Sequence, residues 1–154
     1  MILRRATPLD GPAVGTLHRH TMRASLPFLP ELHTLTDVID FATCEILPNN
    51  EVWVAEAAAR LTGYIAFTPD WIHHLYVHPE VQGQGIGPRL LALALADGRD
   101  RRLWTFQQNA RARRFYEACG FVLLELTDGA NNEEKTPDAL YEWRAGHTKS
   151  PQGL

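Results

Sequence analysis

The strongest pattern of apolar and polar positions in the chain lies between residues 71 and 96. Trp71 to Val77 is a run of apolar, β-branched and aromatic residues, which is typical of a strand, and Pro79 ends it. Glycines follow at alternate positions, and then an almost continuous apolar run from Leu90 to Ala96. This run is rich in Leu and Ala and lacks the alternation of a strand, so it predicts a buried helix.

Alternation and turn residues predict the remaining elements. Other strands are expected at residues 2–6, 51–57, 61–68, 102–106, 121–127 and 140–144. Other helices are expected to start near residues 7–10 and reach Met22, to run from Thr36 to Ile46, and to run from Asn109 to Cys119. The resulting order, β-α-α-β-β-β-α-β-α-β-β, predicts an α+β fold (a mixed α/β architecture).

Length and composition suit one domain. The chain has 154 residues, 45% of them hydrophobic and 21% charged, which is ordinary for a soluble globular protein. We expect one domain over residues 1–145. Residues 146–154 are rich in Ser, Pro and Gly and are expected to form a disordered tail.

Charge, hydropathy and cysteine spacing limit the partners. The formal net charge of −3 gives no general attraction to nucleic acid. No apolar run approaches the roughly 18 residues of a membrane span, and Met1 to Arg5 lacks a signal-peptide core. Cys44 and Cys119 lie far apart in no metal-type spacing and indicate structural thiols in a reducing compartment. We expect a cytoplasmic protein with no metal and no membrane or nucleic-acid partner.

The glycine-rich turn has the features of an anion-binding site. Gly83, Gly85 and Gly87 lack the side chains that would keep a phosphate away from the backbone. The helix that follows adds roughly half a positive charge at its N-terminus. A Walker loop would need a Gly-Lys-Ser/Thr ending and a dinucleotide turn would need G-x-G-x-x-G, whereas this turn has G-x-G-x-G. The sequence therefore predicts a phosphate site of another kind.

Two motifs carry a resemblance to a known family. Gln82, Gly85 and Gly87 fit the pattern Gln/Arg-x-x-Gly-x-Gly/Ala. The second pattern is Asn-x-x-Ala-x-x-Phe-Tyr-x-x-x-Gly-Phe, and the residues that meet it are Asn109, Ala112, Phe115, Tyr116, Gly120 and Phe121. The chain thus resembles the GNAT superfamily of acetyl-CoA-dependent N-acetyltransferases, closely over residues 71–121 and by element order elsewhere.

The resemblance implies the GNAT fold with acetyl-CoA as cosubstrate. This fold is a mixed, mostly antiparallel sheet of about seven strands flanked by helices and splayed between strands 4 and 5, with the pantetheine arm in the gap. The cofactor-binding residues that it implies are Leu75, Tyr76, Val77, Gln82, Gly83, Gln84, Gly85, Ile86, Gly87, Pro88, Asn109 and Tyr116. Pro88, expected at the first helical position, lacks the N–H that relatives offer to a phosphate.

Tyr116 and Leu75 are candidate catalytic residues. Asn109 and Tyr116 are seven positions apart, so they share one helix stripe and lie ~10 Å apart along its axis. By resemblance, Asn109 contacts the pantetheine and the Tyr116 hydroxyl protonates the leaving thiolate. This proton transfer is feasible because the solution pKa is near ~10 for tyrosine and near ~8.5 for the thiol. The Leu75 N–H is expected to polarise the thioester oxygen. The alternative for Tyr116 is a core aromatic whose hydroxyl is bonded elsewhere.

His73 is the candidate base that takes the proton of the acceptor amine. By resemblance it occupies the position of a catalytic histidine in arylalkylamine acetyltransferases, and its ordinary pKa near ~6.5 suits the role. It precedes Leu75 by two residues and so shares its face in a regular strand, whereas His74 points to the other face and is interpreted as structural. A structural or pocket-lining role for His73, ordered water, and Glu56 stay open as alternatives.

The acceptor site is expected near the loop between the first two helices, where relatives build the acceptor wall. The residues expected to bind the acceptor are Met22, Phe28, Leu29, Trp71 and His73, with Pro30 beside them. The apolar and aromatic character of this set predicts an acceptor with a hydrophobic or aromatic part.

The remaining signals are interpreted as structural. The arginines at residues 99–102 and 111–114 are expected on solvated faces, without an assignment of which of them meets the 3′-phosphate of the cofactor. His18 and His20 are two positions apart, hence on different helix faces, which disfavours a metal pair. Cys119 is expected to be an inert buried thiol.

We expect an N-acetyltransferase that moves the acetyl group of acetyl-CoA to a primary amine by direct attack in a ternary complex. No residue is placed to hold a covalent acetyl group. The alternative is a GNAT-fold module that binds or senses acyl-CoA with little catalysis. The acceptor is left open as a small-molecule amine or a protein or peptide amine, and a homodimer is an open alternative to a monomer.

Overall fold

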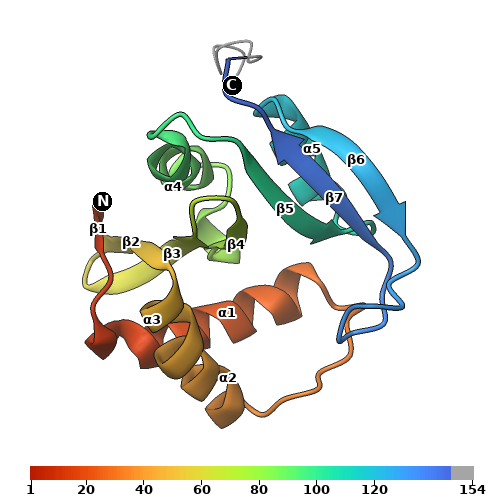
Figure 1. The fold of residues 1–154 in the computed structure, drawn as a ribbon. Helices are drawn as coiled ribbons and strands as arrows, with labels where there is room; N and C mark the ends of the chain where they lie inside the picture. The colour runs from red at the N-terminus through yellow and green to blue at the C-terminus, as the bar shows by residue number, and fades with distance from the viewer. Residues whose placement is uncertain (147–154) are drawn as a thin grey trace. The chain divides into compact units, whose positions relative to one another are not determined.

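The computed structural model describes residues 1–146, which form two compact units (Figure 1). The first contains residues 1–68 and 72–96, and the second contains residues 69–71 and 97–146. The tail predicted to be disordered lies, apart from Gly146, outside the described residues. None of the helices in residues 1–146 has the length and apolar character that a membrane crossing requires.

The first unit is built on a four-stranded antiparallel sheet in the order β1-β2-β3-β4. The strands are β1 (Ile2–Arg5), β2 (Glu51–Ala57), β3 (Arg60–Phe67) and β4 (Ile72–Val77). All four were predicted to within one residue at either end. The tight turn between β2 and β3 places Ala58 and Ala59 at positive φ, 51° and 60°. β4 is one of the two terminal strands of this sheet, with β1 at the other edge.

Helical segments precede the second strand and follow the fourth. They are η1 (Pro8–Asp10), α1 (Gly11–Ser25), α2 (Leu35–Phe41), the π turn η2 (Ala42–Ile46), α3 (Leu47–Asn49), η3 (Pro79–Val81) and α4 (Ile86–Leu95). α1 and α2 lie side by side in Figure 1. Their approach is close because Gly15 has no side chain: an added Cβ atom would lie 2.7 Å from the Cα of Ile39.

The helices of the first unit cover both faces of its sheet. On one face, Tyr64 of β3 packs in a core cluster with Val14 of α1 and Ile46 of η2. Gly63 is the preceding residue of β3 and therefore faces the other side. There, a Cβ atom at Gly63 would lie 3.1 Å from the Leu90 side chain of α4. The sheet is thus sandwiched between α1 with η2 and α4.

The second unit is a three-stranded antiparallel sheet in the order β5-β7-β6 with one helix. Its elements are β5 (Arg101–Phe106), α5 (Ala110–Ala118), β6 (Val122–Thr127) and β7 (Asp138–Trp143). α5 packs on one face, where Arg113 Nε donates to the Tyr141 hydroxyl at 3.0 Å and this hydroxyl donates to Glu117. Trp71 forms an isolated parallel bridge with Arg102 of β5.

The α+β class and the seven strands predicted from the sequence are confirmed. In the structure these strands form one sheet of four and one sheet of three, and β4 and β5 are terminal strands of their sheets. The splay predicted between these two strands concerns the relation between the units and stays a prediction.

Candidate active site

The glycine-rich turn after β4 forms an open cradle before α4. Gly83 and Gly85 have φ values of 81° and 86°, in the left-handed region that favours glycine. A Cβ atom added at Gly85 would meet no other atom within 4 Å, so the space beside this residue is open. Gly85 is also the N-cap of α4, where backbone N–H groups lack partners inside the helix. The cradle therefore combines open space with the donors that an anion requires.

α4 begins two residues before the predicted start. Its first residue is Ile86, so Gly87 and Pro88 belong to the first turn, and Pro88 is the third helical residue instead of the first. The nitrogen of Pro88 still carries no hydrogen. The donors that this turn offers to an anion are therefore the N–H groups of Ile86 and Gly87.

β4 presents backbone groups along the edge that β3 does not occupy. The His78 N–H donates to the Thr62 carbonyl oxygen at 2.7 Å, which fixes the direction of the groups on this side of β4. In an antiparallel pair, alternate residues direct both backbone groups to the same neighbour. The N–H groups of Leu75 and Val77 therefore point away from β3. This orientation suits the roles expected for Leu75 and for an added strand.

Gln82 joins the cradle to the edge of β4. Its side-chain Nε2 donates to the Val77 carbonyl oxygen at 3.1 Å. A carbonyl that points away from β3 thereby gains a partner within the turn itself. The Gln82 side chain consequently shapes the loop with one of its two amide hydrogens.

His73 is the extra residue of a β-bulge. The pairing of β3 with β4 shifts between Ala66 and Phe67, where β4 has one residue more than β3. Bulges interrupt the ladder and redirect a side chain, and they are frequent beside active sites. The expectation that His73 shares a face with Leu75 assumes regular alternation, which the bulge interrupts, so it stays a prediction.

The His73 imidazole is exposed and has one defined contact. Its Nε2 lies 3.2 Å from the Thr68 hydroxyl oxygen. Partial burial of the ring lowers the pKa of His73 below its ordinary value of 6.5. The imidazole is therefore mostly neutral at pH 7 and can accept a proton.

His74 belongs to a buried cluster on the face that α1 covers. Its ring lies 5.5 Å from that of His18 and 6.1 Å from that of Tyr76, measured between centroids. The His18 Nδ1 lies 2.7 Å from the Tyr64 hydroxyl, whereas the buried His74 Nδ1 has no hydrogen-bond partner among the described residues. Burial lowers the pKa of His18 to about 4 and that of His74 to about 3. Both rings are neutral, as the structural interpretation of His74 requires.

The second motif forms α5 of the second unit. Asn109 caps the helix, since its Oδ1 accepts the Ala112 N–H at 3.2 Å, and its amide Nδ2 is the group that can donate to a ligand. Gly120 ends the helix at a φ of 94°. Tyr116 is only 7% exposed and packs against Phe121 at a centroid distance of 5.4 Å. The predicted caps are therefore confirmed, while the catalytic role of Tyr116 stays a prediction.

The loop expected to contact the acceptor follows α1. Phe28 and Leu29 are half-buried there, as is Met22 on α1 itself. The loop is fastened to α1 by Glu31, which forms ion pairs with Arg23 and, at 3.6 Å, with Arg19. Glu31 thus joins the loop to two successive turns of α1, while its role as the acceptor wall stays a prediction.

The structure also bears on three other interpretations from the sequence, which concern Arg101, Cys119 and Glu56. Arg101 does not lie on a solvated face, because it is 1% exposed and bonded to Asp97 at 2.9 Å. Cys119 is buried, and burial raises its thiol pKa to about 11, which agrees with an inert thiol, whereas Cys44 is exposed. Glu56, the reserve candidate for the base, is engaged by the Arg4 guanidinium at 2.9 Å.

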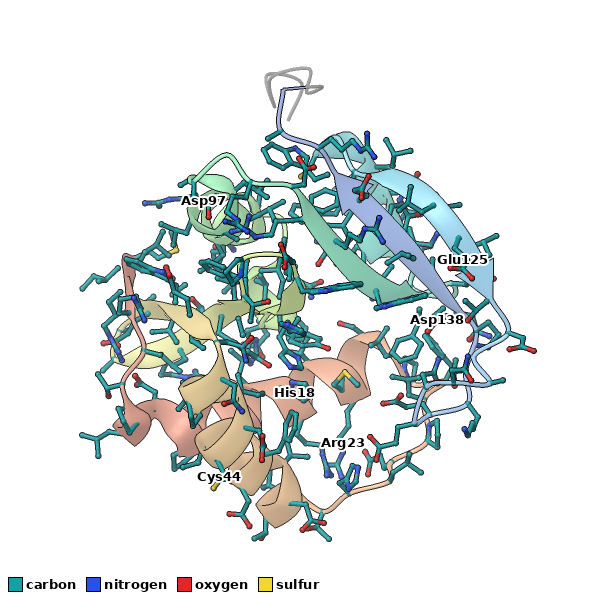
Figure 2. All side chains as sticks on the ribbon, in the orientation of Figure 1. His18, Arg23, Cys44, Asp97, Glu125 and Asp138 are labelled. Carbon is teal, nitrogen blue, oxygen red and sulfur yellow. The ribbon has the colours of Figure 1, made fainter. Side chains whose placement is uncertain are left out.

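Sequence reasoning missed the bulge at His73, the contact between His18 and Tyr64, and a cavity in the second unit that contains Glu125 and Asp138. The two carboxylates lie on neighbouring strands of one sheet, as Figure 2 shows. Alternation on β6 and β7 could have placed them on one face only if the register of the two strands had been known. Within residues 1–146, no group of three or more His, Cys, Asp or Glu side chains is arranged to hold a metal.

Comparisons with known proteins agree with this architecture. The family described as "Acetyltransferase (GNAT) domain" matches residues 48–123. A relative named Probable N-acetyltransferase Rv2775, from Mycobacterium tuberculosis, is 32% identical over 137 residues, which cover 77% of this chain and 78% of that protein. The peptidyl-lysine N-acetyltransferase YjaB of Salmonella typhimurium is 29% identical over 122 residues, covering 77% of this chain and 81% of that one.

The fold is also that of solved structures. The PaiA N-acetyltransferase of Thermoplasma acidophilum, solved in complex with coenzyme A, superposes with a TM-score of 0.73 at 20% identity, covering 93% of this chain and 98% of that one. The fold, the two motifs and the relatives together define an acyltransferase. The chain belongs to the GNAT superfamily of N-acetyltransferases.

Proposed function

We propose that this protein transfers the acetyl group of acetyl-CoA to a primary amine by direct attack in a ternary complex. The observation that carries the proposal is the succession of an available strand edge on β4, a bulge that exposes His73, and the open cradle at Gly85. An acetyl-CoA thioester needs these three things: a backbone donor for its carbonyl, a base for the acceptor, and a seat for its pyrophosphate.

The residues present fit acetyl-CoA as cosubstrate. Open space beside Gly85 and the N–H groups of the first turn of α4 suit a pyrophosphate. The outward N–H groups of Leu75 and Val77 suit the amides of a pantetheine chain, in the manner of an added strand. Coenzyme A bound to the related PaiA protein supports the same assignment.

In the proposed reaction, the acceptor nitrogen attacks the thioester carbonyl carbon, so a C–N bond forms and the C–S bond breaks. His73 takes the proton of the amine, directly or through one water, since its lowered pKa keeps it neutral at pH 7. The Leu75 N–H stabilises the negative charge that develops on the carbonyl oxygen. Tyr116 gives its phenolic proton to the departing thiolate, in line with its place in the second motif.

The acceptors to be considered include protein lysines. YjaB of Salmonella typhimurium is named as a peptidyl-lysine N-acetyltransferase, and this supports lysine side chains beside small-molecule amines as acceptors. We further propose that the protein acts in the cytoplasm, the compartment that the sequence predicts. The half-buried Phe28 and Leu29 are proposed as the apolar wall of the acceptor site.

Thiol release from acetyl-CoA with a panel of alkylamines, arylalkylamines, amino acids and lysine peptides tests the proposal. Amine-dependent release with at least one acceptor is expected. A module that only binds or senses acyl-CoA would bind acetyl-CoA in calorimetry but would release thiol at the background rate with every amine. That outcome would replace the enzyme by the sensing alternative.

A further inference from the structure

The hydroxyl of Thr68 and the imidazole of His73 form a contact inside the first unit. Thr68 Oγ1 lies 3.2 Å from His73 Nε2, and both residues belong to the unit that contains residues 1–68 and 72–96. Thr68 follows the last residue of β3, and His73 is the bulge residue near the start of β4. The bulge therefore directs the candidate base to the end of β3.

Both side chains extend from a firmly packed backbone. Phe67 and Ile72 close the connection between the strands as a β pair, and they are 6% and 4% exposed. Thr68 follows the first of them and His73 follows the second. Pro69 restricts the backbone of Thr68 to extended conformations, and branching at Cβ restricts its χ1 angle. The fold thus sets the position of the hydroxyl.

This hydroxyl is the one hydrogen-bond partner of the His73 ring within residues 1–146. No carboxylate of this part of the chain pairs with the ring, and Asp70, the acidic residue of the connection, is paired with Arg99 at 3.5 Å. The titratable group beside the ring is the buried His74, which stays neutral because burial lowers its pKa to about 3. His73 is thus held at Nε2, and its Nδ1 is open.

The contact distinguishes the two nitrogens of the ring. A neutral imidazole carries hydrogen on one nitrogen and a lone pair on the other, and the hydrogen bond that one nitrogen makes decides which. A threonine hydroxyl can donate or accept. If it donated to Nε2, the open Nδ1 would carry the hydrogen and could not take a proton. If it accepts from Nε2, the lone pair is on Nδ1 of an exposed ring, where an acceptor can reach it.

We propose that Thr68 is the positioning residue of the proposed base: its hydroxyl oxygen accepts the Nε2–H of His73, and Nδ1 takes the proton of the acceptor amine. This proposal rests on the proposed acetyl transfer. As the proton moves, an N–H bond of the amine breaks and an Nδ1–H bond forms, while the Nε2–H bond is unchanged. The contact with Thr68 therefore persists in the imidazolium, which then releases its proton to water.

A hydroxyl suits this task better than a carboxylate. A carboxylate beside Nε2 would stabilise the imidazolium and raise the pKa of His73. Partial burial lowers that pKa here, and a neutral oxygen orients the ring without the charge that would reverse the shift. The base thus keeps its proton-accepting form at pH 7 and does not retain the proton after the transfer.

Three variants test the role of the hydroxyl. Thr68→Val keeps the branched shape without the hydroxyl, and Thr68→Ser keeps the hydroxyl. Thr62→Val is the matched control, because Thr62 on the same strand donates to the Ala55 carbonyl oxygen at 3.2 Å. With an alkylamine, Thr68→Val should lower kcat/KM about three- to tenfold, the range for loss of one neutral hydrogen bond, and leave acetyl-CoA affinity unchanged. Thr68→Ser and Thr62→Val should resemble wild type, and an undiminished kcat/KM in Thr68→Val contradicts the proposal.

A double variant shows whether Thr68 acts through His73. In the background of His73→Ala, which lacks the ring, Thr68→Val should cause no further loss of kcat/KM, because the group that it positions is absent. An equal loss in both backgrounds would assign Thr68 to packing and overturn the proposal. Unfolding midpoints show that each variant is folded.

Nuclear magnetic resonance separates the failure of this proposal from that of acetyl transfer, because it needs no turnover. The nitrogen-15 shifts of the ring, assigned to His73 by comparison with His73→Gln, report which nitrogen carries hydrogen at pH 7.5. Wild type and Thr68→Ser should carry it on Nε2 alone, and Thr68→Val should show a mixture of the two tautomers. Hydrogen on Nδ1 in wild type, or shifts that Thr68→Val leaves unchanged, overturns the proposal. If no amine is acetylated, the expected shifts still support Thr68 as the group that orients His73, and the failure belongs to the proposed function.

Discussion

The Nδ1 of His18 lies 2.7 Å from the hydroxyl of the fully buried Tyr64, and this contact joins α1 to β3 of the first sheet. Burial raises the pKa of Tyr64 well above 10, so the phenol keeps its proton. The same environment keeps His18 neutral. The fold of the first unit therefore depends on uncharged histidines.

This dependence predicts acid sensitivity. His18 and His74 have pKa values lowered to about 4 and about 3, whereas the unfolded chain takes up protons near 6.5. Below pH 6.5 the unfolded state binds more protons, so the free energy of unfolding falls as pH falls, by up to ~1.4 kcal/mol per pH unit for each histidine. Denaturant unfolding at pH 7.5, 6.5, 5.8 and 5.0 measures the slope before most carboxylates titrate. His74→Phe should make it shallower; an unchanged slope would contradict the assignment.

Gly85→Val should abolish the binding of acetyl-CoA. The side chain would enter the open space of the cradle, and valine at a φ of 86° also strains the backbone. Gly98→Val is the matched control, since Gly98 has a φ of 72° and equally open surroundings outside the cradle. Calorimetry should show binding lost in the first variant alone, although both lose stability. Equal affinities would move the pyrophosphate elsewhere.

Tyr116→Phe should lower kcat by ~10²–10⁴-fold and leave acetyl-CoA affinity near that of wild type. The change keeps the packing against Phe121 and removes the proton donor. Tyr141→Phe removes a phenol of the same unit that bonds to Arg113, and should affect stability more than turnover. Single-turnover rates measure the chemical step, and calorimetry measures the affinity for acetyl-CoA. If kcat of Tyr116→Phe stays within a few-fold of wild type, the hydroxyl has a packing role only.

His73→Gln should remove one ionisation from the pH profile. With an alkylamine, log(kcat/KM) rises with unit slope because the amine must lose its proton, and His73 adds a second unit of slope below its own pKa. That pKa is lowered, so the steeper limb lies below pH 6.5. The exposed His20 supplies the control, His20→Gln, because a change at His74 would disturb the buried cluster. A steep limb retained at full rate in His73→Gln would assign the proton to ordered water.

Phe28→Ala should raise KM for the best amine several-fold and leave the acetyl-CoA affinity unchanged. A half-buried ring contributes apolar area to the proposed acceptor wall. Leu9→Ala truncates an apolar side chain that is 91% exposed on η1 and serves as control. Steady-state kinetics with the acceptor varied gives the result, and an unaltered KM would place the wall elsewhere.

The sequence was sufficient for the elements that local patterns define. The caps at Asn109 and Gly120, the positive φ of Gly85 and the strand that ends at Val77 each depend on a few adjacent residues. Residue types with strong positional preferences, glycine at positive φ and asparagine at helix N-termini, therefore allowed the cradle and α5 to be predicted, together with the class of fold.

Features that depend on pairing between distant segments escaped prediction. The bulge at His73 exists because β3 and β4 shift by one residue, which neither strand shows alone. Arg101 lies among charged residues in the sequence and looks exposed, yet it is buried and bonded to Asp97 across a turn. Glu125 faces the cavity because a second bulge, between Leu123 and Glu125, resets the alternation of β6.

The bond from Gln82 to the Val77 carbonyl oxygen explains a choice of residues in the family motif. The motif accepts Gln or Arg at this position, two side chains that differ in charge and shape. They have in common a long reach that ends in an N–H donor. Glutamate has nearly the same length but offers no hydrogen when ionised and would bring a negative charge to the proposed pyrophosphate site. The position therefore requires a side chain that donates a hydrogen bond, and a positive charge on that side chain is not needed.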